Sequence, residues 1–468
     1  MHAGTDAAIA LDEATREAEP RASPGSGIPM GAVFRLLLAL ALLWAVNFTL
    51  LVTGHRTGCP VTFPIAILLG PPFHPRGVPY ALAYLLVLGF GLRMRRLGAA
   101  QAWALGLLLL LFGNLAQGGF DAGFLKPFYQ PYLGTHVQYF HDAVRIRSPG
   151  VWLSEFNTAQ PHLLIHSRTH PPFAVLLHFF VLQAAWGNLA FLSLAFVLIS
   201  SLTLPVVWLV LREVGADARR AGLLTLLLAA TPAFNIYGAV SLDGVIAFLA
   251  SVFLLGCVRV ARSGPSAGAV SLMTIGFLSV SLLSFGGVFL VVATGLAGLF
   301  QTEGRGRRAL LTALAITVGM SALVFIAVHR VWGYDHVQAF MTASRLENRH
   351  GFLLVSRPLV YAMTRVEDVA EIVLFLSLGT AATMVRMPWR RGGDGDPVTG
   401  VMMGAVGTLA LMFASGAYRT GETARACLFA YPYLLLALRR LAPERAFALI
   451  CFAGVQTLVM QLLGNFFW

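Results

Sequence analysis

Long apolar runs recur along nearly the whole of this sequence, beginning at residue 31. Most are about 17–23 residues long, which is enough for a helix to cross the roughly 30 Å hydrocarbon core of a membrane. The composition agrees, because 57% of the residues are hydrophobic and only 12% are charged, too few to give a soluble particle a polar surface. The sequence therefore predicts an all-α fold, a polytopic transmembrane helical bundle of about 12–14 helices.

Three regions are expected along the chain. Residues 1–30 mix acidic, basic and small residues without periodicity, which is typical of a disordered tail, here on the cytoplasmic side. Residues 31–97 hold N-terminal transmembrane helices, and 98–468 form the main transmembrane domain with a long outer loop at 118–170. The run at 31–54 is long for a cleavable signal and is expected to be a membrane anchor. The expected spans are 31–54, 78–94, 98–117, 189–210, 221–237, 240–260, 266–283, 284–300, 309–329, 366–386, 399–416, 426–441 and 446–466.

Arginines in short loops set the expected orientation. The formal net charge is +12, but the basic residues lie between apolar runs, a pattern typical of membrane orientation and not of nucleic-acid binding. With the N-terminus in the cytoplasm, all the basic loops face the cytoplasm if residues 171–210 cross the membrane once. Residues 171–186 are therefore expected to form a re-entrant or juxtamembrane helix. The basic loops contain Arg93, Arg95 and Arg96; Arg212, Arg219 and Arg220; Arg259 and Arg262; Arg305, Arg307 and Arg308; Arg386, Arg390 and Arg391; and Arg439, Arg440 and Arg445.

The other loops then emerge on the outer side, which is usually poor in arginine. Several arginines nevertheless lie there, and an anionic ligand at the outer membrane surface would explain them. A second explanation is that long loops translocate whatever their charge and that their arginines meet lipid phosphates, which accounts for Arg345 and Arg349. The outer loops are 118–170, 237–243, 330–358 and 417–425.

Asp121 lies just beyond the expected span 98–117, in the segment Gly-Gly-Phe-Asp-Ala-Gly-Phe. A carboxylate at the membrane boundary can take a proton from an incoming hydroxyl if partial burial and neighbouring cations tune it. The alternative is a structural role, as a solvated turn residue between glycines or as the partner of Lys126 in an ion pair.

The segment His166-Ser-Arg168-Thr-His170-Pro-Pro opens the expected re-entrant helix. Proline suits the first turn of a helix, where its missing N–H costs nothing. Two imidazoles and a guanidinium at that N-terminus predict a phosphate site, supported by free backbone amides and the helix dipole. The alternative is a belt of polar residues at the membrane interface.

No metal site is expected from the sequence. The His166-X-X-X-His170 spacing lacks an adjacent carboxylate, and the prolines that follow disrupt a regular helix across the motif. The four cysteines, Cys59, Cys257, Cys427 and Cys451, are scattered without metal-ligand spacing.

Two further segments carry charge on the outer side. Asp243 follows Ser241 and Leu242 at a tight corner, where it is expected to cap the next helix. Arg419-Thr-Gly-Glu422-Thr-Ala-Arg425 precedes the expected span 426–441. Glu422 and Arg425 fit a structural i,i+3 pair on a helix. Arg419 and Arg425 also fit a clamp on phosphate oxygens.

The order of these features resembles the GT-C class of membrane glycosyltransferases, which includes protein O-mannosyltransferases and lipid A aminoarabinose transferases. The similarity rests on Phe120-Asp121 after a span, a long outer loop and Thr169-His170-Pro-Pro. It continues through the hairpin from Thr231-Pro232 to Ser241-Leu-Asp243 and ends with Gly421-Glu422-Thr-Ala-Arg425, which is similar to uncharacterised bacterial members. Together these motifs cover roughly residues 98–440.

The resemblance implies transfer of a sugar from a polyprenyl-phosphate donor to an acceptor hydroxyl at the extracytoplasmic face. Asp121 would be the base, with Asp142 as a rival. His166, Arg168 and His170 would hold the donor phosphate together with Lys126, Arg419 and Arg425, supported by Asp243 and Glu422. The chain departs from the family pattern at Ala122, where a second acidic residue is frequent, and at His170, where lysine or arginine is frequent.

The sequence leaves two other functions open. One is a flippase for lipid-linked sugars or a polysaccharide transporter, although such proteins usually place charges at mid-membrane and show internal repeats. The other is an inactive relative that acts as a scaffold. The expected partners are membrane lipid, the polyprenyl-phosphate sugar and a glycan, lipid or protein acceptor, with no nucleic acid and no cofactor. A multi-pass protein of the bacterial inner membrane is the expected localisation.

Overall fold

The computed structural model describes residues 27–54, 74–130, 136–301, 304–387, 396–416, 423–464 and 466. Within these ranges every regular element is a helix, so the predicted all-α class is confirmed. Eight helical segments of the described chain are long and apolar enough to cross a membrane, which identifies a multi-pass integral membrane protein. They are α2 (Met30–Val52), α3 (Val78–Arg93), α4 (Ala99–Ala116), α10 with α11 (Leu189–Ser201 and Thr203–Glu213), α14 (Leu242–Ser263), α17 (Gly304–Trp332), α22 (Pro397–Ser415) and α25 (Pro443–Leu463).

The described residues thus contain fewer spans than the 12–14 helices that the sequence predicts. Several expected spans are short apolar helices, and at 1.5 Å per residue a helix of 13 residues reaches only about 20 Å. The expected short helix at 171–186 is found as α9, which has 13 residues. The short apolar helices are α9 (Pro172–Ala184), α15 (Ala267–Leu283), η4 with α16 (Phe285–Gly287 and Val288–Phe300) and the 428–438 segment, made of η5 (Leu428–Ala430), α24 (Tyr431–Leu435) and η6 (Leu436–Leu438).

Two other expected spans are broken by local backbone geometry. The span at 221–237 divides into α12 (Ala218–Ala230) and α13 (Pro232–Tyr237), because a proline disfavours the helical conformation of the residue before it. Thr231 is accordingly extended, with ψ of 141°. The span at 366–386 divides into α20 (Pro358–Phe375) and α21 (Leu378–Arg386), which meet at 103°, and Ser377 between them has a φ of +74°. If α20 and α21 together cross the membrane once, the described chain has nine spans.

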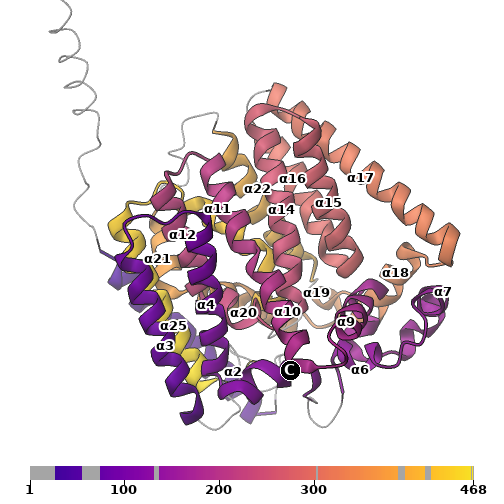
Figure 1. The fold of residues 1–468 in the computed structure, drawn as a ribbon, viewed down its shortest axis with the longest axis horizontal. Helices are drawn as coiled ribbons and strands as arrows, with labels where there is room; N and C mark the ends of the chain where they lie inside the picture. Colours follow the sequence, from indigo (N-terminus) through magenta and orange to yellow (C-terminus); the bar gives the residue numbers. More distant parts are fainter. Residues whose placement is uncertain are drawn as a thin grey trace, which may run out of the picture.

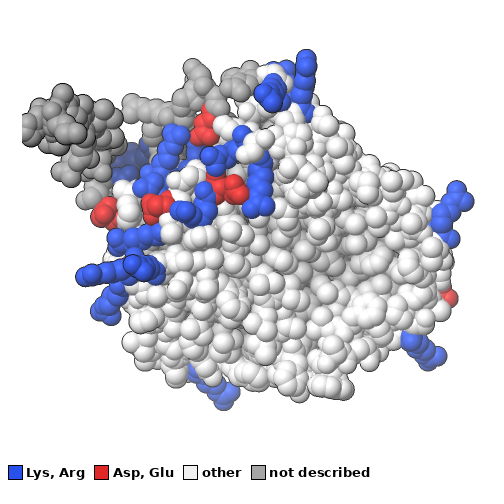
Figure 2. All heavy atoms as spheres, turned by 45° about the horizontal axis from the view of Figure 1, so that its top comes forward, with Lys and Arg blue, Asp and Glu red and all other residues white. Residues whose placement is uncertain are grey.

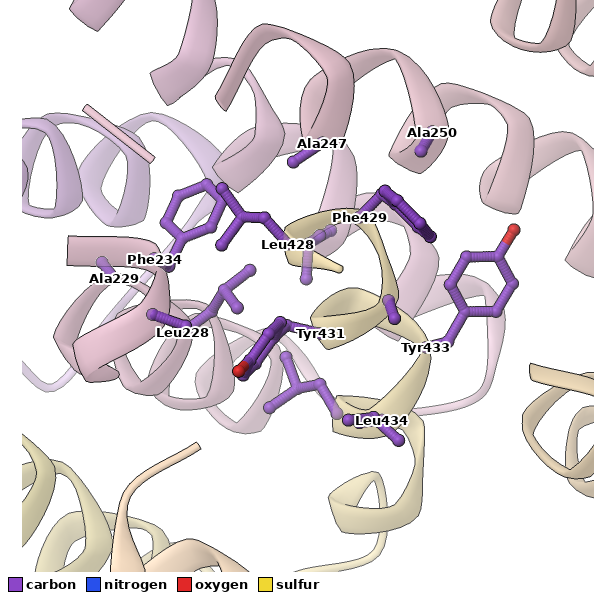
Figure 3. Close-up of a cluster of buried hydrophobic side chains, with 14 of the residues drawn as sticks. Leu228, Ala229, Phe234, Ala247, Ala250, Leu428, Phe429, Tyr431, Tyr433 and Leu434 are labelled. Atoms are coloured by element: carbon purple, nitrogen blue, oxygen red, sulfur yellow. The ribbon is translucent and has the colours of Figure 1, made fainter. Parts of the chain in front are cut away.

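The helices pack around α14, as Figure 1 shows. In the apolar window of α14, 78% of the residues are buried, whereas the value is 22% for α17, which runs along the right-hand edge of the view. Figure 3 shows part of the core beside α14, where Phe234 of α13, Ala247 of α14 and Leu428 of η5 lie together. The 428–438 segment is therefore held deep in the bundle, and it directly follows the polar segment that carries Arg425.

Charged side chains gather at one end of the bundle, which we call the arginine end. Figure 2 shows basic and acidic residues grouped at this end above a broad uncharged wall. Ion pairs connect the loops here: Arg259 Nε lies 2.7 Å from Glu213 Oε1, and Arg439 Nη2 lies 2.5 Å from Asp396 Oδ2. This is the end that the positive-inside rule assigns to the cytoplasm.

The opposite end, which we call the loop end, is formed by the described parts of 118–170 and by 330–358. It contains α5 (Lys126–Tyr129), α6 (Tyr139–Ala143), α7 (Pro149–Ala159), η3 (Gln160–His162), α8 (Ile165–Arg168), α18 (His336–Glu347) and α19 (Leu353–Ser356). Asn157 joins the two loops, because its Nδ2 donates to the Asp335 carbonyl at 2.7 Å and its Oδ1 accepts from the Asp335 N–H at 2.9 Å. Gln160 adds a bond of 2.9 Å to the Ala339 carbonyl.

A chain of buried amides joins three helices near the loop end. Gln461 of α25 accepts from Gln117 at 2.6 Å and donates to Asn235 of α13 at 3.2 Å. Asn235 also donates to the Leu109 carbonyl of α4 at 3.0 Å. Gly113 makes this approach possible, since a Cβ there would lie 1.9 Å from Asn235 Oδ1. Such networks rigidify an apolar bundle when every member is bonded.

The sidedness of the two ends gives a testable prediction. In a variant without native cysteines, Ser154→Cys and His350→Cys at the loop end should react with an impermeant maleimide added outside intact cells. Arg308→Cys at the arginine end should react only after permeabilisation, because the positive-inside rule assigns the basic loops to the cytoplasm. Labelling of Ser154→Cys and Arg308→Cys from the same side would contradict the topology.

Candidate functional site

A cavity of about 70 Å³ lies at the loop end, walled by segments far apart in the sequence. Since one water needs about 10–15 Å³, the cavity has room for a group of roughly five heavy atoms, the size of a phosphate. Its polar wall contains His166 and His170 before α9, Asp243 at the start of α14, and Arg425. The structure therefore brings together residues from three of the segments that the sequence singles out.

Three imidazoles surround the ring of Tyr139 on one side of the cavity. The centroid of the Tyr139 ring lies 5.6 Å from that of His166, 5.3 Å from that of His170 and 5.1 Å from that of His178. Tyr237 and Phe466 lie on another part of the wall, and their rings meet edge to face. The cavity thus combines polar groups with flat apolar surfaces.

Burial affects the protonation of His166 and His170, the two histidines that precede α9. Burial, followed by the nearby charge of Arg425, lowers the pKa of His166 well below its usual value. Burial lowers the pKa of His170 to about 4, although a hydrogen bond to the His166 backbone acts in the opposite direction. Near pH 7 the positive charge on the cavity wall therefore comes from Arg425.

Arg425 forms an ion pair with Asp243, whose carboxylate oxygen lies 3.6 Å from Arg425 Nε. The two side chains are mostly buried, with 17% and 25% of their surfaces exposed. Asp243 does not cap α14 as expected: Ser241 is the capping residue, and its Oγ accepts from the Gly244 N–H at 3.2 Å. Ser241 caps the helix, and the Asp243 carboxylate pairs with the guanidinium of Arg425.

Two buried carboxylates of α20 hold the segment that carries Arg425. Glu371 Oε2 accepts from the N–H groups of Thr423 and Ala424, at 2.6 and 3.3 Å. Asp368 Oδ1 accepts from the Thr423 hydroxyl at 2.6 Å. Asp368 is also paired with Arg365 at 2.9 Å. These contacts fix α23 (Thr423–Ala426) beside the cavity.

Sequence reasoning missed these acids, although a signal was present. Glu367, Asp368 and Glu371 lie within four positions of each other in an otherwise apolar stretch. Ionisable residues inside a membrane segment are costly, so they are usually paired or functional. All three are fully buried here, and Glu367 accepts a hydrogen bond of 2.6 Å from Asn47 of α2.

Asp121 lies apart from the cavity wall. Its carboxylate is 3.1 Å from Lys126 Nζ and accepts a hydrogen bond of 3.2 Å from the Tyr129 hydroxyl. Its side chain is 61% exposed and that of Lys126 is 40% exposed. This is the ion pair that the sequence allowed as the structural alternative, and such an exposed pair contributes about 0–1 kcal/mol.

Asp142, the rival carboxylate, is buried and has a structural partner. Its Oδ2 accepts from the Leu164 N–H at 3.2 Å, at the start of α8, and its Oδ1 lies 3.7 Å from Arg145. Asp142 therefore fixes the turn that leads to His166 and His170. It is not among the described residues that line the cavity.

The remaining predicted site residues are placed as follows. Arg168 does not line the cavity, and its backbone carbonyl accepts from Gln160 Nε2 at 2.9 Å. Arg419 and Glu422 lie outside the described residues. No group of three or more His, Cys, Asp or Glu residues in the described ranges is arranged to hold a metal ion.

Comparisons with protein-family models, with curated proteins and with solved structures gave no match to this chain. The function must therefore be argued from the geometry of the cavity and from the resemblance seen in the motifs.

The contacts of Glu371 give a second prediction. Glu371→Leu removes the acceptor of two backbone N–H groups and leaves them buried, at a cost of about 1–3 kcal/mol each. The thermal unfolding midpoint of the purified protein in detergent should therefore fall.

Glu371→Gln keeps an acceptor oxygen at the same position, so its midpoint should lie between those of the wild type and Glu371→Leu. A midpoint of Glu371→Leu equal to that of the wild type would show that these hydrogen bonds do not hold the segment.

Proposed function

We propose that the protein is a membrane glycosyltransferase of the GT-C type. It transfers a sugar from a polyprenyl-phosphate donor to an acceptor hydroxyl, in the cavity at the loop end. The proposal rests on one observation. His166, His170, Asp243 and Arg425 line the same cavity, beside an apolar bundle. This arrangement suits a substrate with a lipid tail and an anionic head.

Arg425 supplies the charge for the donor phosphate. A guanidinium is always protonated, and its planar array of N–H groups matches phosphate oxygens. The Asp243 carboxylate orients the guanidinium, and the half-buried ring of His166 offers a neutral N–H donor next to it. The cavity matches the size of a phosphate, so the sugar would extend toward the ring faces of Tyr139 and Tyr237, which line the same wall.

One observation favours transport of a lipid-linked sugar as a second candidate. Transporters place ionisable residues in broken helices, and α20 carries three buried acids next to a bend of 103°. The carboxylates, however, have structural partners: Asn47 for Glu367, and Thr423 for both Asp368 and Glu371. Because Asp368 and Glu371 hold the segment that carries Arg425, their structural role supports the transferase over the transporter.

A reconstituted assay tests the proposal. Purified protein in nanodiscs is incubated with a panel of labelled polyprenyl-phosphate sugars and candidate acceptors, and both product and released polyprenyl phosphate are measured. Arg425→Gln should raise the KM for the donor by roughly 10- to 100-fold, because a hydrogen bond to a charged group contributes about 1.5–3 kcal/mol.

Arg345→Gln is the matched control, since Arg345 is exposed at the same end and lies outside the cavity. Equal effects of the two substitutions would contradict the assignment of the phosphate site. Movement of a lipid-linked sugar across proteoliposomes without any transfer would instead support the transporter, and neither activity with any donor would support an inactive scaffold.

A further inference from the structure

The ring of His170 is held in one tautomer by the backbone of its own segment. Nδ1 lies 3.0 Å from the carbonyl oxygen of His166 and 3.3 Å from Thr169 Oγ1. A carbonyl oxygen can only accept, so the proton of the neutral ring must be on Nδ1. The Thr169 hydroxyl donates elsewhere, to the Ile165 carbonyl at 2.9 Å, which agrees with this assignment.

The fixed tautomer leaves Nε2 as the acceptor nitrogen of His170. Burial keeps the ring neutral near pH 7, because it lowers the pKa of His170 to about 4. His170 and Arg425 line the same cavity, so Nε2 is the ring nitrogen of His170 that remains to accept a proton at this site.

We propose that Nε2 of His170 is the proton acceptor of the transfer reaction, a role that rests on the proposed function. The acceptor hydroxyl oxygen attacks the anomeric carbon of the donor and forms the new C–O bond. The bond between that carbon and the phosphate oxygen breaks, and its electron pair stays on the phosphate, which leaves as polyprenyl phosphate. The hydroxyl proton passes to Nε2, and the imidazolium then returns it to water.

The alternatives are less suited to this role. The Asp121 carboxylate is paired with Lys126 away from the cavity wall, and Asp142 accepts from the Leu164 backbone. His178 also has Nδ1 bonded to a carbonyl, that of Ala174 at 2.8 Å. Its ring, however, is 99% buried and packs among the rings of Phe128, Tyr139 and Phe196, which leaves little room for a hydroxyl.

The donor itself would make His170 a stronger base. Burial is the main cause that lowers the pKa of His170, and the charge of Arg425 lowers it further. A bound phosphate neutralises this charge and places an anion near the ring, and both changes raise the pKa toward the working pH. The other titratable groups on the cavity wall are His166, Tyr139, His178, Tyr237 and Asp243.

The first arm of the test measures turnover. His170→Asn retains a donor that can reach the His166 carbonyl but has no basic nitrogen. At saturating donor its kcat should fall by about 10²–10⁴, the usual contribution of a positioned base, with a much smaller change in donor KM. His162→Asn is the control, because His162 is exposed in the same loop and lies outside the cavity.

The second arm does not depend on activity. Solid-state ¹⁵N NMR of histidine-labelled protein, with His170→Asn as the difference reference, should show His170 at pH 7 with Nδ1 protonated and Nε2 unprotonated. Protonated Nε2 would overturn the proposal.

The outcomes separate the two proposals. If the wild type transfers sugar and His170→Asn retains near-normal kcat while Asp121→Asn loses it, His170 is not the base, and the transferase stands. If the wild type transfers no sugar from any donor, the proposed function and the base assignment are both overturned, whatever the tautomer.

Discussion

Polar groups inside this bundle must find partners within the protein, because the surrounding hydrocarbon supplies none. In the described chain, connected contacts join several of these buried polar groups. Gln117, Gln461 and Asn235 join α4, α25 and α13, and the carboxylates of α20 take up the N–H and O–H groups of Thr423 and Ala424. The same contacts hold the helix ends together and fix the segment that carries Arg425.

The cavity follows from interrupted helices and from these contacts. The break at Pro232 ends α12 early and lets α13 bring Tyr237 to the wall, and the bonds to α20 hold the segment of Arg425 opposite His166. Phe466 reaches the wall because its N–H donates to Gln117 at 2.5 Å. The cavity is thus built from loops and helix ends, which carry polar groups, while the long helices supply the apolar surface around it.

Sequence reasoning predicted the features that depend on composition and length. The helical class, the short helix at 171–186 and helices such as α3 and α14 follow from apolar runs of sufficient length. The interruptions at Thr231 and Ser377 were not predicted. Pro232 was a local signal for the first, whereas the apolar pattern continues across Ser377 and gives no such signal.

The candidate site was predicted in part. For Asp121 the sequence left a catalytic base and an ion pair with Lys126 open, and the structure shows the ion pair, at the start of a π-helical segment. The role of Asp243 was misread, because Ser241 two positions earlier competes for the same cap. Photocrosslinking gives the most direct test of the central claim, that the cavity at the loop end binds the phosphate of a lipid-linked sugar. A polyprenyl-phosphate analogue with a diazirine beside its phosphate should label peptides containing Tyr139 or residues 166–170, whereas labelling confined to the bend between α20 and α21 would contradict it.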